Sequence, residues 1–194
     1  GIKMAVSYMR VNGNKISTHI AFYNFGSAGQ MELNNQVGEL NVDDVLAPQI
    51  FFCDNSTAVA VRTDGFTVFS GSQSPKEKKT VKFDQEIIST FHDGNRIGFV
   101  FDGGDSGHKY LMKVYNTGGK NTMQKYFDLQ YNSITLQKDK IVLFNEKEFA
   151  IYKLNGQKTF QGKYRKPIQN VLSIRGFRKY MVITEDSADL IRLG

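Results

Sequence analysis

Short runs of alternating apolar and polar residues, separated by glycine and asparagine turns, recur along this chain of 194 residues. The pattern is clearest from residue 87 to residue 130, where four such runs are joined by three turns. The first turn is Asp93-Gly94-Asn95, and the last is Asn116-Thr117-Gly118-Gly119. A period of two residues is typical of a strand with one buried face, and Asp-Gly or Asn-Gly pairs favour tight hairpins. The stretch therefore predicts an antiparallel meander of four strands.

The same order of runs and turns recurs before and after this stretch. The second strands of four copies centre on Val59, Ile97, Ile141 and Met181, about 38, 44 and 40 residues apart, near the spacing of four-stranded propeller repeats. A β-sandwich also places a strand about every 8–12 residues, but its pattern of strands and turns need not recur at every fourth strand. We therefore predict an all-β chain that forms a β-propeller of four-stranded antiparallel blades, with a sandwich or irregular barrel as the alternative.

We predict one partial propeller domain over residues 1–194, made of four to five blades. The approximate predicted blades are residues 1–47, 48–86, 87–130, 131–167 and 168–194. The first copy lacks an opening strand and the last lacks a closing strand. Since complete propellers have about 4–8 blades, the chain is either an arc of a larger ring or half of a pair of copies that complete one another. Open blade edges favour self-association or a protein partner.

Several local features give more specific expectations. Hairpin turns are predicted at Asn12-Gly13-Asn14 and at Asn155-Gly156. Residues 34–48 show no clear alternation, so we expect an extended connection there, in which Asp43 and Asp44 cap a single helical turn. A short strand is expected to start at residues 31–33. The polar residues 70–78 predict a loop, followed by a strand that begins at Thr80.

Composition and charge limit the function classes only broadly. The formal net charge of +6 favours acidic partners such as nucleic acid, anionic lipid or wall polymers. The basic residues are scattered, however, and the densest clusters, such as residues 76–79, fall at predicted turns or strand ends. Lysines at such positions usually keep sheet edges soluble, so nucleic acid is not the expected partner. The single cysteine, Cys53, excludes an intramolecular disulfide.

The tetrapeptide Gly104-Asp105-Ser106-Gly107 matches the sequence around the serine of chymotrypsin-like proteases. A serine nucleophile also needs a histidine base and an orienting acid. The three histidines are His19, His92 and His108. His19 lies within an alternating strand, and His108 is only two residues from Ser106 on the same loop, so neither stands in the setting of such a base. The glycines instead fit a hairpin loop that needs unusual backbone angles. We predict no catalytic residue in this motif.

Five polar residues remain as candidate ligand-binding positions. They are His92, Asp93, Asp102, Asp105 and His108. His92 beside Asp93 is where an acid and a histidine could face a propeller channel. Asp102 and Asp105 offer oxygen ligands, but a calcium site needs about six to eight oxygens and the spacing of a calcium loop is absent. We predict no metal site and no cofactor, since no phosphate loop, paired cysteine or histidine-pair motif is present.

The Asp-Gly-Asn, Asn-Thr-Gly-Gly and Asn-Gly turns between aromatic strands resemble propellers of the PQQ-like and WD-repeat-like superfamilies. More narrowly, nearly the whole chain is similar in pattern to propeller-like proteins of Gram-positive clostridia, which carry a membrane anchor near the N-terminus and a propeller outside the cell. Tryptophan is absent, so the Trp-Asp dipeptide and the tryptophan docking motif of quinone-dependent dehydrogenases are missing. The resemblance implies a location on the extracytoplasmic side of a bacterial membrane, with any anchor outside this sequence, and a cytoplasmic location as the alternative.

Three hypotheses for function follow from these observations. The first is a non-enzymatic binding or scaffolding domain that contacts a protein or a surface polymer through the loops between its strands. The second is a hydrolase or lyase with a channel-facing acid or histidine. The third is a polyanion or nucleic-acid surface in which exposed tyrosine and phenylalanine rings stack on bases, with binding that weakens steeply with salt.

Overall fold

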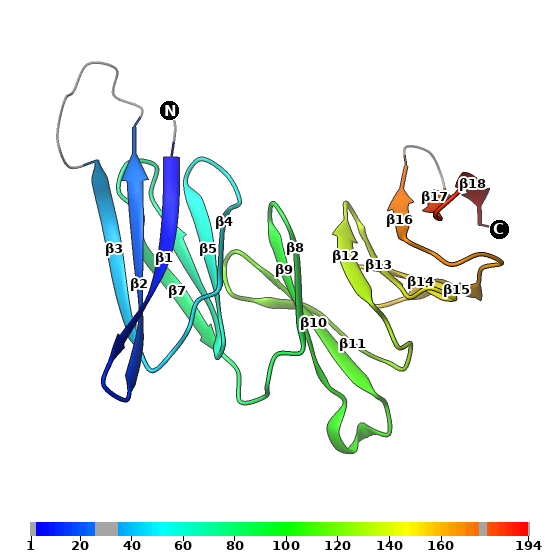
Figure 1. Ribbon diagram of the computed structural model, residues 1–194, viewed down its shortest axis with the longest axis horizontal. Coiled ribbons are helices and arrows are strands. Elements are labelled where there is room, and N and C mark those ends of the chain that lie inside the picture. The colour runs from blue at the N-terminus through cyan, green and yellow to red at the C-terminus, as the bar shows by residue number, and fades with distance from the viewer. Residues whose placement is uncertain (1–2, 26–34, 175–177, 194) are drawn as a thin grey trace. The chain divides into compact units, whose positions relative to one another are not determined.

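The computed structural model describes residues 3–25, 35–174 and 178–193, and this part of the chain is built mainly from β-strands (Figure 1). Its strands, β1 to β18, form five antiparallel sheets in which neighbours in sequence are neighbours in the sheet. None of the helices within these three ranges is long and apolar enough to cross a membrane. The chain divides into two compact units, residues 1–87 with 117–120 and residues 88–116 with 121–194.

The first unit contains one three-stranded and one four-stranded sheet. The three-stranded sheet consists of β1 (Lys3–Asn12), β2 (Lys15–Asn24) and β3 (Gln36–Asp43). The four-stranded sheet consists of β4 (Gln49–Phe52), β5 (Thr57–Arg62), β6 (Gly65–Ser70) and β7 (Lys76–Lys82). The predicted hairpin between β1 and β2 is confirmed, and Gly13 in its turn has φ of 62°. Ile20 and Phe22 of the first sheet pack with Ala60 and Phe69 of the second, so the two sheets share one apolar core.

The predicted connection over residues 34–48 is wrong, because β3 occupies residues 36–43 and pairs with β2. The register of this pairing shifts near its start, where β3 carries one extra residue. This bulge lets Val37 and Leu40 pack against the same apolar core although they are three positions apart. The bulge therefore hides the period of two in the sequence. The strand start expected at residues 31–33 lies outside the described residues.

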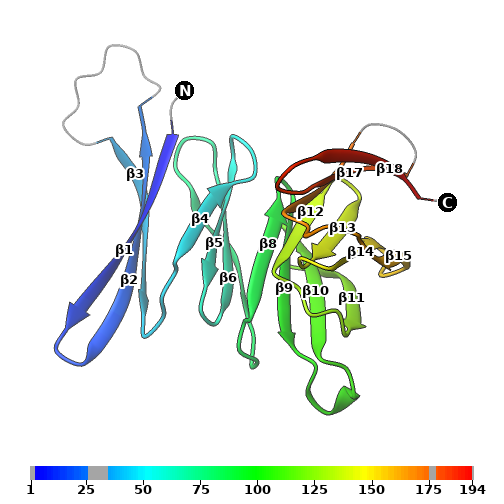
Figure 2. The ribbon, with the colours of Figure 1, turned by 45° about the vertical axis from the view of Figure 1, so that its right-hand side comes forward.

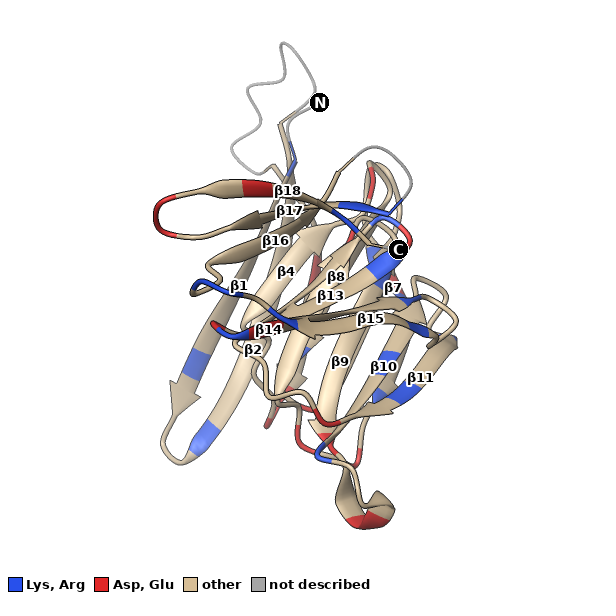
Figure 3. Cartoon of the chain, turned by 90° about the vertical axis from the view of Figure 1, so that its right-hand side faces the viewer, with Lys and Arg blue, Asp and Glu red and all other residues tan. Residues whose placement is uncertain are grey.

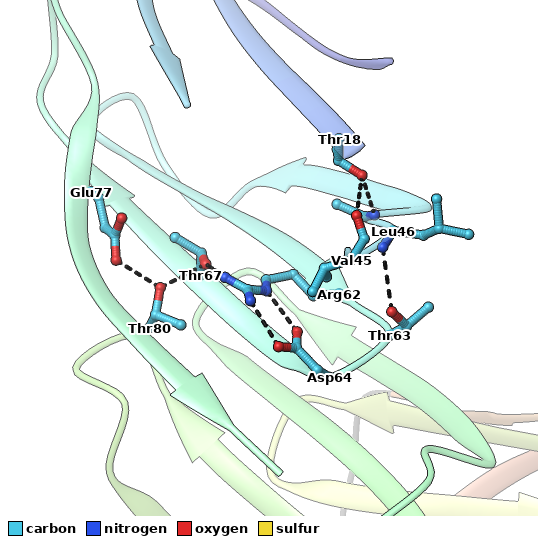
Figure 4. A network of polar contacts seen from close by, with 10 residues as sticks. Thr18, Val45, Leu46, Arg62, Thr63, Asp64, Thr67, Glu77 and Thr80 are labelled. Atoms are coloured by element: carbon cyan, nitrogen blue, oxygen red, sulfur yellow. Dashed lines mark hydrogen bonds and ion pairs between the residues drawn. The ribbon is translucent and has the colours of Figure 1, made fainter. Parts of the chain in front are cut away.

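The helical turn expected after Asp43 and Asp44 is also wrong. Asp44 has φ of 56°, and its backbone N–H donates a hydrogen bond of 2.8 Å to the carbonyl of Ile16 in the neighbouring strand. The hydroxyl of Thr18 then donates to the carbonyl of Val45 at 2.6 Å (Figure 4). These bonds tie the connection to the start of β2, the central strand of the sheet, and satisfy backbone groups that a helical turn would otherwise have satisfied.

The loop expected over residues 70–78 is shorter than predicted. Strand β7 begins at Lys76, which is opposite Ser70, so the strand starts four residues before Thr80. It forms the outer edge of its sheet, and residues 76–79 are exposed. An exposed edge strand without apolar alternation looks like a loop in sequence. Its lysines hinder pairing with another sheet edge.

A buried ion pair organises the second sheet of this unit. Arg62 is 6% exposed, and its guanidinium donates two hydrogen bonds of 2.8 Å to the carboxylate of Asp64 in the β5–β6 turn (Figure 4). Arg62 also donates to the hydroxyl of Thr67 at 3.3 Å. The hydroxyls of Thr67 and Thr80 share a hydrogen bond of 2.8 Å, and Thr80 donates to Glu77 at 2.7 Å. The network therefore crosses β5, β6 and β7.

The second unit contains three sheets (Figure 2). The first consists of β8 (Ser89–Asp93), β9 (Arg96–Asp102), β10 (Tyr110–Asn116) and β11 (Asn121–Phe127). The second consists of β12 (Ser133–Gln137), β13 (Lys140–Phe144), β14 (Glu148–Lys153) and β15 (Lys158–Lys163). The third consists of β16 (Asn170–Ser173), β17 (Lys179–Ile183) and β18 (Ala188–Arg192). A short 3-10 helix, η1 (Gly104–Ser106), connects β9 to β10.

The four-stranded meander predicted for residues 87–130 is confirmed, and so is the hairpin at Asn155-Gly156. Apolar clusters join each pair of consecutive sheets in this unit. Met112 and Ile141 belong to the cluster between the first and second sheets. Ile151 and Val182 belong to the cluster between the second and third. Each sheet therefore buries a face against its neighbour in the chain.

We predict that Asp64→Ala destabilises the chain by about 3 kcal/mol, the lower end of the range for breaking a buried ion pair, because Asp64 is 29% exposed. The substitution leaves the guanidinium of Arg62 buried without its carboxylate. Urea unfolding followed by circular dichroism measures the change. Asp84→Ala, at an exposed position, serves as the control and changes stability little. Equal stabilities for the two variants would contradict the structural role of the ion pair.

Candidate ligand-binding groove

A groove with a volume of about 480 Å³ lies between the first two sheets of the second unit. Strand β11 contributes three consecutive residues to it, Lys125, Tyr126 and Phe127. Successive side chains of a strand point to opposite faces, so a groove lined by all three must run along the edge of β11. Glu148 and Gln130 line both this groove and a second depression of about 620 Å³, which makes the hollow elongated.

The floor of the groove is apolar and tightly packed. Phe127 is 3% exposed and belongs to the core between the two sheets. Tyr152 of β14 is equally buried, and its ring centroid lies 6.5 Å from that of Phe127. Burial, with a smaller contribution from the charge of Asp128, raises the pKa of Tyr152 to about 12. This phenol therefore stays neutral at physiological pH and forms part of a fixed floor.

One end of the groove is organised by a hydrogen bond between His108 and Asp128. His108 Nδ1 lies 2.9 Å from Asp128 Oδ2, and the backbone N–H of Lys109 donates to Asp128 Oδ1 at 3.0 Å. The imidazole of His108 also stacks on the ring of Tyr126, with centroids 5.7 Å apart. The backbone hydrogen bond from Lys109, followed by the bond to His108, lowers the pKa of Asp128. Asp128 thus stays ionised and fixes the position of the imidazole.

The opposite wall is formed by β14 and β15. Lys158 Nζ donates to Gln161 Oε1 at 2.8 Å, and Gln161 Nε2 lies 3.5 Å from Glu148 Oε2. Together with Lys109 and Lys125, this lysine gives the rim several ammonium groups. Figure 3 shows basic residues on β11 and β15. The arrangement can bind carboxylates or other anions along a rim whose own two acids are already hydrogen-bonded.

His92 and Asp93, two of the predicted ligand-binding residues, do not share a site. They are consecutive in β8, so their side chains point to opposite faces of the sheet. Asp93 Oδ1 accepts the backbone N–H groups of Asn95 and Arg96 at 3.1 and 3.0 Å, and the Arg96 guanidinium lies 2.6 Å from Asp93 Oδ2. Asp93 therefore holds the β8–β9 turn. Burial lowers the pKa of His92, against a smaller opposing effect of Asp93.

Asp102 is the last residue of β9, and Asp105 lies in η1, in the connection that follows. Asp102 Oδ1 accepts the backbone N–H of Gly104 at 2.7 Å and so fixes the start of the loop. Asp105 is exposed within η1. A side chain at Gly103 would lie 1.8 Å from a backbone oxygen, so only glycine fits there. Over the described ranges, no group of three or more His, Cys, Asp or Glu side chains could hold a metal ion.

Of the five predicted positions, only His108 lines the groove. The sequence did not single out Asp128, Lys125 or Lys158. Asp128 is twenty residues from His108 and meets it only because β10 and β11 form a hairpin whose two ends lie together. Lys158 comes from the next sheet. A polar residue directly after an alternating strand, as Asp128 follows Phe127, is the sequence signal that could have indicated this end of the groove.

We predict that the Asp128 carboxyl titrates below the ordinary aspartate value of about 3.9. Because its folded pKa is lowered, its contribution to stability is present above that ordinary value and is lost as pH falls through the folded pKa. Carboxyl ¹³C titration by NMR measures the pKa, and Asp128→Asn, which removes the ionisation, should remove this part of the acid sensitivity. A titration at or above the ordinary value would contradict the hydrogen-bonding pattern.

Comparison with known proteins gives a fold and a family. The model of DUF5711, described as a family of unknown function, matches residues 1–193. No curated protein matches the chain. The structure of Hsv2 from Kluyvelomyces marxianus is similar, with 11% identity and a TM-score of 0.58 over 92% of this chain and 56% of that one. Sqt1 from Saccharomyces cerevisiae has 10% identity and a TM-score of 0.54 over 97% of this chain and 59% of that one.

A third similar structure, BBS1N in complex with ARL6DN, has 11% identity and a TM-score of 0.51 over 91% of this chain and 59% of that chain. Sqt1 and BBS1N are propeller proteins, so the predicted fold class, a β-propeller fragment, is confirmed. The chain spans less than two thirds of the length of each of these structures. The predicted single domain and its blade limits stay predictions.

Proposed function

The chain belongs to DUF5711, a family of unknown function, and we propose that it is a non-enzymatic binding or scaffolding domain whose groove holds a protein partner. The groove along β11 carries this proposal. It combines a rigid apolar floor, an exposed aromatic pair and a rim of lysines, which is the composition of a binding surface with a central anchor and a polar border. The two acidic residues of the groove, Asp128 and Glu148, accept hydrogen bonds from Lys109 and Gln161 of the same chain.

The fold is compatible with this role. Propellers present loops and strand edges on a rigid scaffold, and one similar structure, BBS1N, was solved in complex with another protein, ARL6DN. For the present chain, a protein partner is an inference from the groove and from this fold. The partner can also be a second copy of the chain, since several sheets end in open strands.

We predict that a photo-cross-linking amino acid at Tyr126 forms one discrete adduct with a partner in cells that produce the protein naturally. The same amino acid at Asp105, which is exposed in η1 between β9 and β10 and does not line the groove, forms none. Lys125→Glu combined with Lys158→Glu should abolish the Tyr126 adduct. An adduct with twice the mass of the chain would identify a second copy as the partner. Equal labelling from both positions, or none, would contradict the proposal.

We also propose that the domain lies on the extracytoplasmic side of a bacterial membrane, attached through a segment outside this sequence. The resemblance in turn pattern to anchored clostridial proteins supports this location. The test uses a variant in which Cys53→Ser removes the cysteine of this sequence and Asp105→Cys introduces one exposed thiol. We predict that a membrane-impermeant maleimide labels it on intact cells. Labelling that requires cell lysis would place the domain in the cytoplasm instead.

A further inference from the structure

We propose that the groove receives an extended acidic segment, which adds as a further strand to the open edge of β11. This inference rests on the proposed binding function and names the class of partner. Recognition of this kind uses backbone hydrogen bonds for affinity and side-chain contacts for specificity. It requires an available strand edge, weak protection of that edge, and charges that suit the incoming segment.

The edge of β11 meets the first requirement. The sheet has the order β11-β10-β9-β8, so within the described part of the chain β11 pairs only with β10. Alternate residues of an edge strand direct their N–H and C=O groups away from the sheet. The groove runs along this side of the strand, because Lys125, Tyr126 and Phe127 all line it. A peptide lying in the groove would therefore meet these backbone groups.

Among the last strands of the three four-stranded sheets, β11 has the fewest lysines. Strand β7 has four lysines among its seven residues, and β15 has two among six. Strand β11, with seven residues, has one lysine, Lys125, followed by the exposed ring of Tyr126. Edge lysines oppose pairing between strands, so sparse lysines leave β11 open to a partner. The remaining lysine then selects the charge of that partner.

The charges around the edge favour acidic side chains. Lys109, Lys125 and Lys158 lie on the rim, while Asp128 and Glu148 are engaged by neighbours within the protein. In a strand, every second side chain points to the same face, so alternating glutamates on an added strand would meet the lysines from one side. The apolar positions between them would lie on the opposite face of the added strand.

A phosphate polymer fits this arrangement less well than a peptide. It has no backbone N–H and C=O groups that could complete the edge of β11. The two classes of partner differ in a measurable way. Loss of peptide N–H groups should abolish strand addition and leave a purely electrostatic interaction intact.

The test uses the whole chain, labelled with ¹⁵N, and a capped heptapeptide that alternates glutamate with valine and threonine. We expect saturable binding, with shifted and exchange-protected amides confined to residues 121–127 and to the lining residues of the groove. A peptide with alternate N-methylated amides should not bind. Lys125→Glu combined with Lys158→Glu should weaken binding about tenfold, since two partly exposed ion pairs are lost, and should create binding to the matching lysine peptide.

Lys78→Glu combined with Lys79→Glu on β7 makes the same change in net charge and serves as the matched control, with affinity within about twofold of the parent chain. Strand addition would be overturned by any of three results. These are no binding of the acidic peptide, equal binding of the N-methylated peptide, and full displacement of the peptide by inorganic polyphosphate with unchanged β11 amide signals. A Tyr126 cross-link together with a failed peptide titration would leave the groove as a binding site and reject this mode of recognition.

Discussion

The apolar contact between neighbouring sheets is the constraint on which the second unit depends. A four-stranded meander has two faces, and it becomes stable when another layer covers one of them. Met112 and Ile141 come from different sheets, and both are fully buried in the same cluster. The cluster continues to Phe127 and Tyr152, which form the floor of the groove. The groove is therefore the rim of this core, where the packed side chains end and the outer strands begin.

The sequence predicted the strands whose side chains meet this core. The central strands β9 and β13 are buried along most of their length, so they appear as short apolar runs between glycine or asparagine turns. The sequence failed where packing does not impose a simple period. Strand β7 is an exposed edge, and β3 contains a bulge that places Val37 and Leu40 on the core side together. Both were predicted as loop or connection for that reason.

The groove was harder to predict than the fold. His108 stood out because it belongs to a glycine-rich loop, but its partner Asp128 is brought to it by the β10–β11 hairpin. Lys125 and Lys158 come together only through the stacking of two sheets, which the sequence does not encode in any local spacing. Conversely, the sequence predicted Asp93 and Asp102 as ligand-binding residues because each lies beside a turn with another polar residue. In the structure, both accept hydrogen bonds from backbone N–H groups of those turns. A turn residue and a ligand-binding residue have the same signature in sequence.

The most direct test of the shared core is a double-mutant cycle between Phe127 and Tyr152, which lie in different sheets with ring centroids 6.5 Å apart. Unfolding free energies are measured for the parent chain, Phe127→Leu, Tyr152→Leu and the double variant. If the two rings pack against each other across the sheet boundary, the coupling energy should be about 0.5–1.5 kcal/mol. Additive effects of the two substitutions would contradict the stacking of these sheets, and with it the groove.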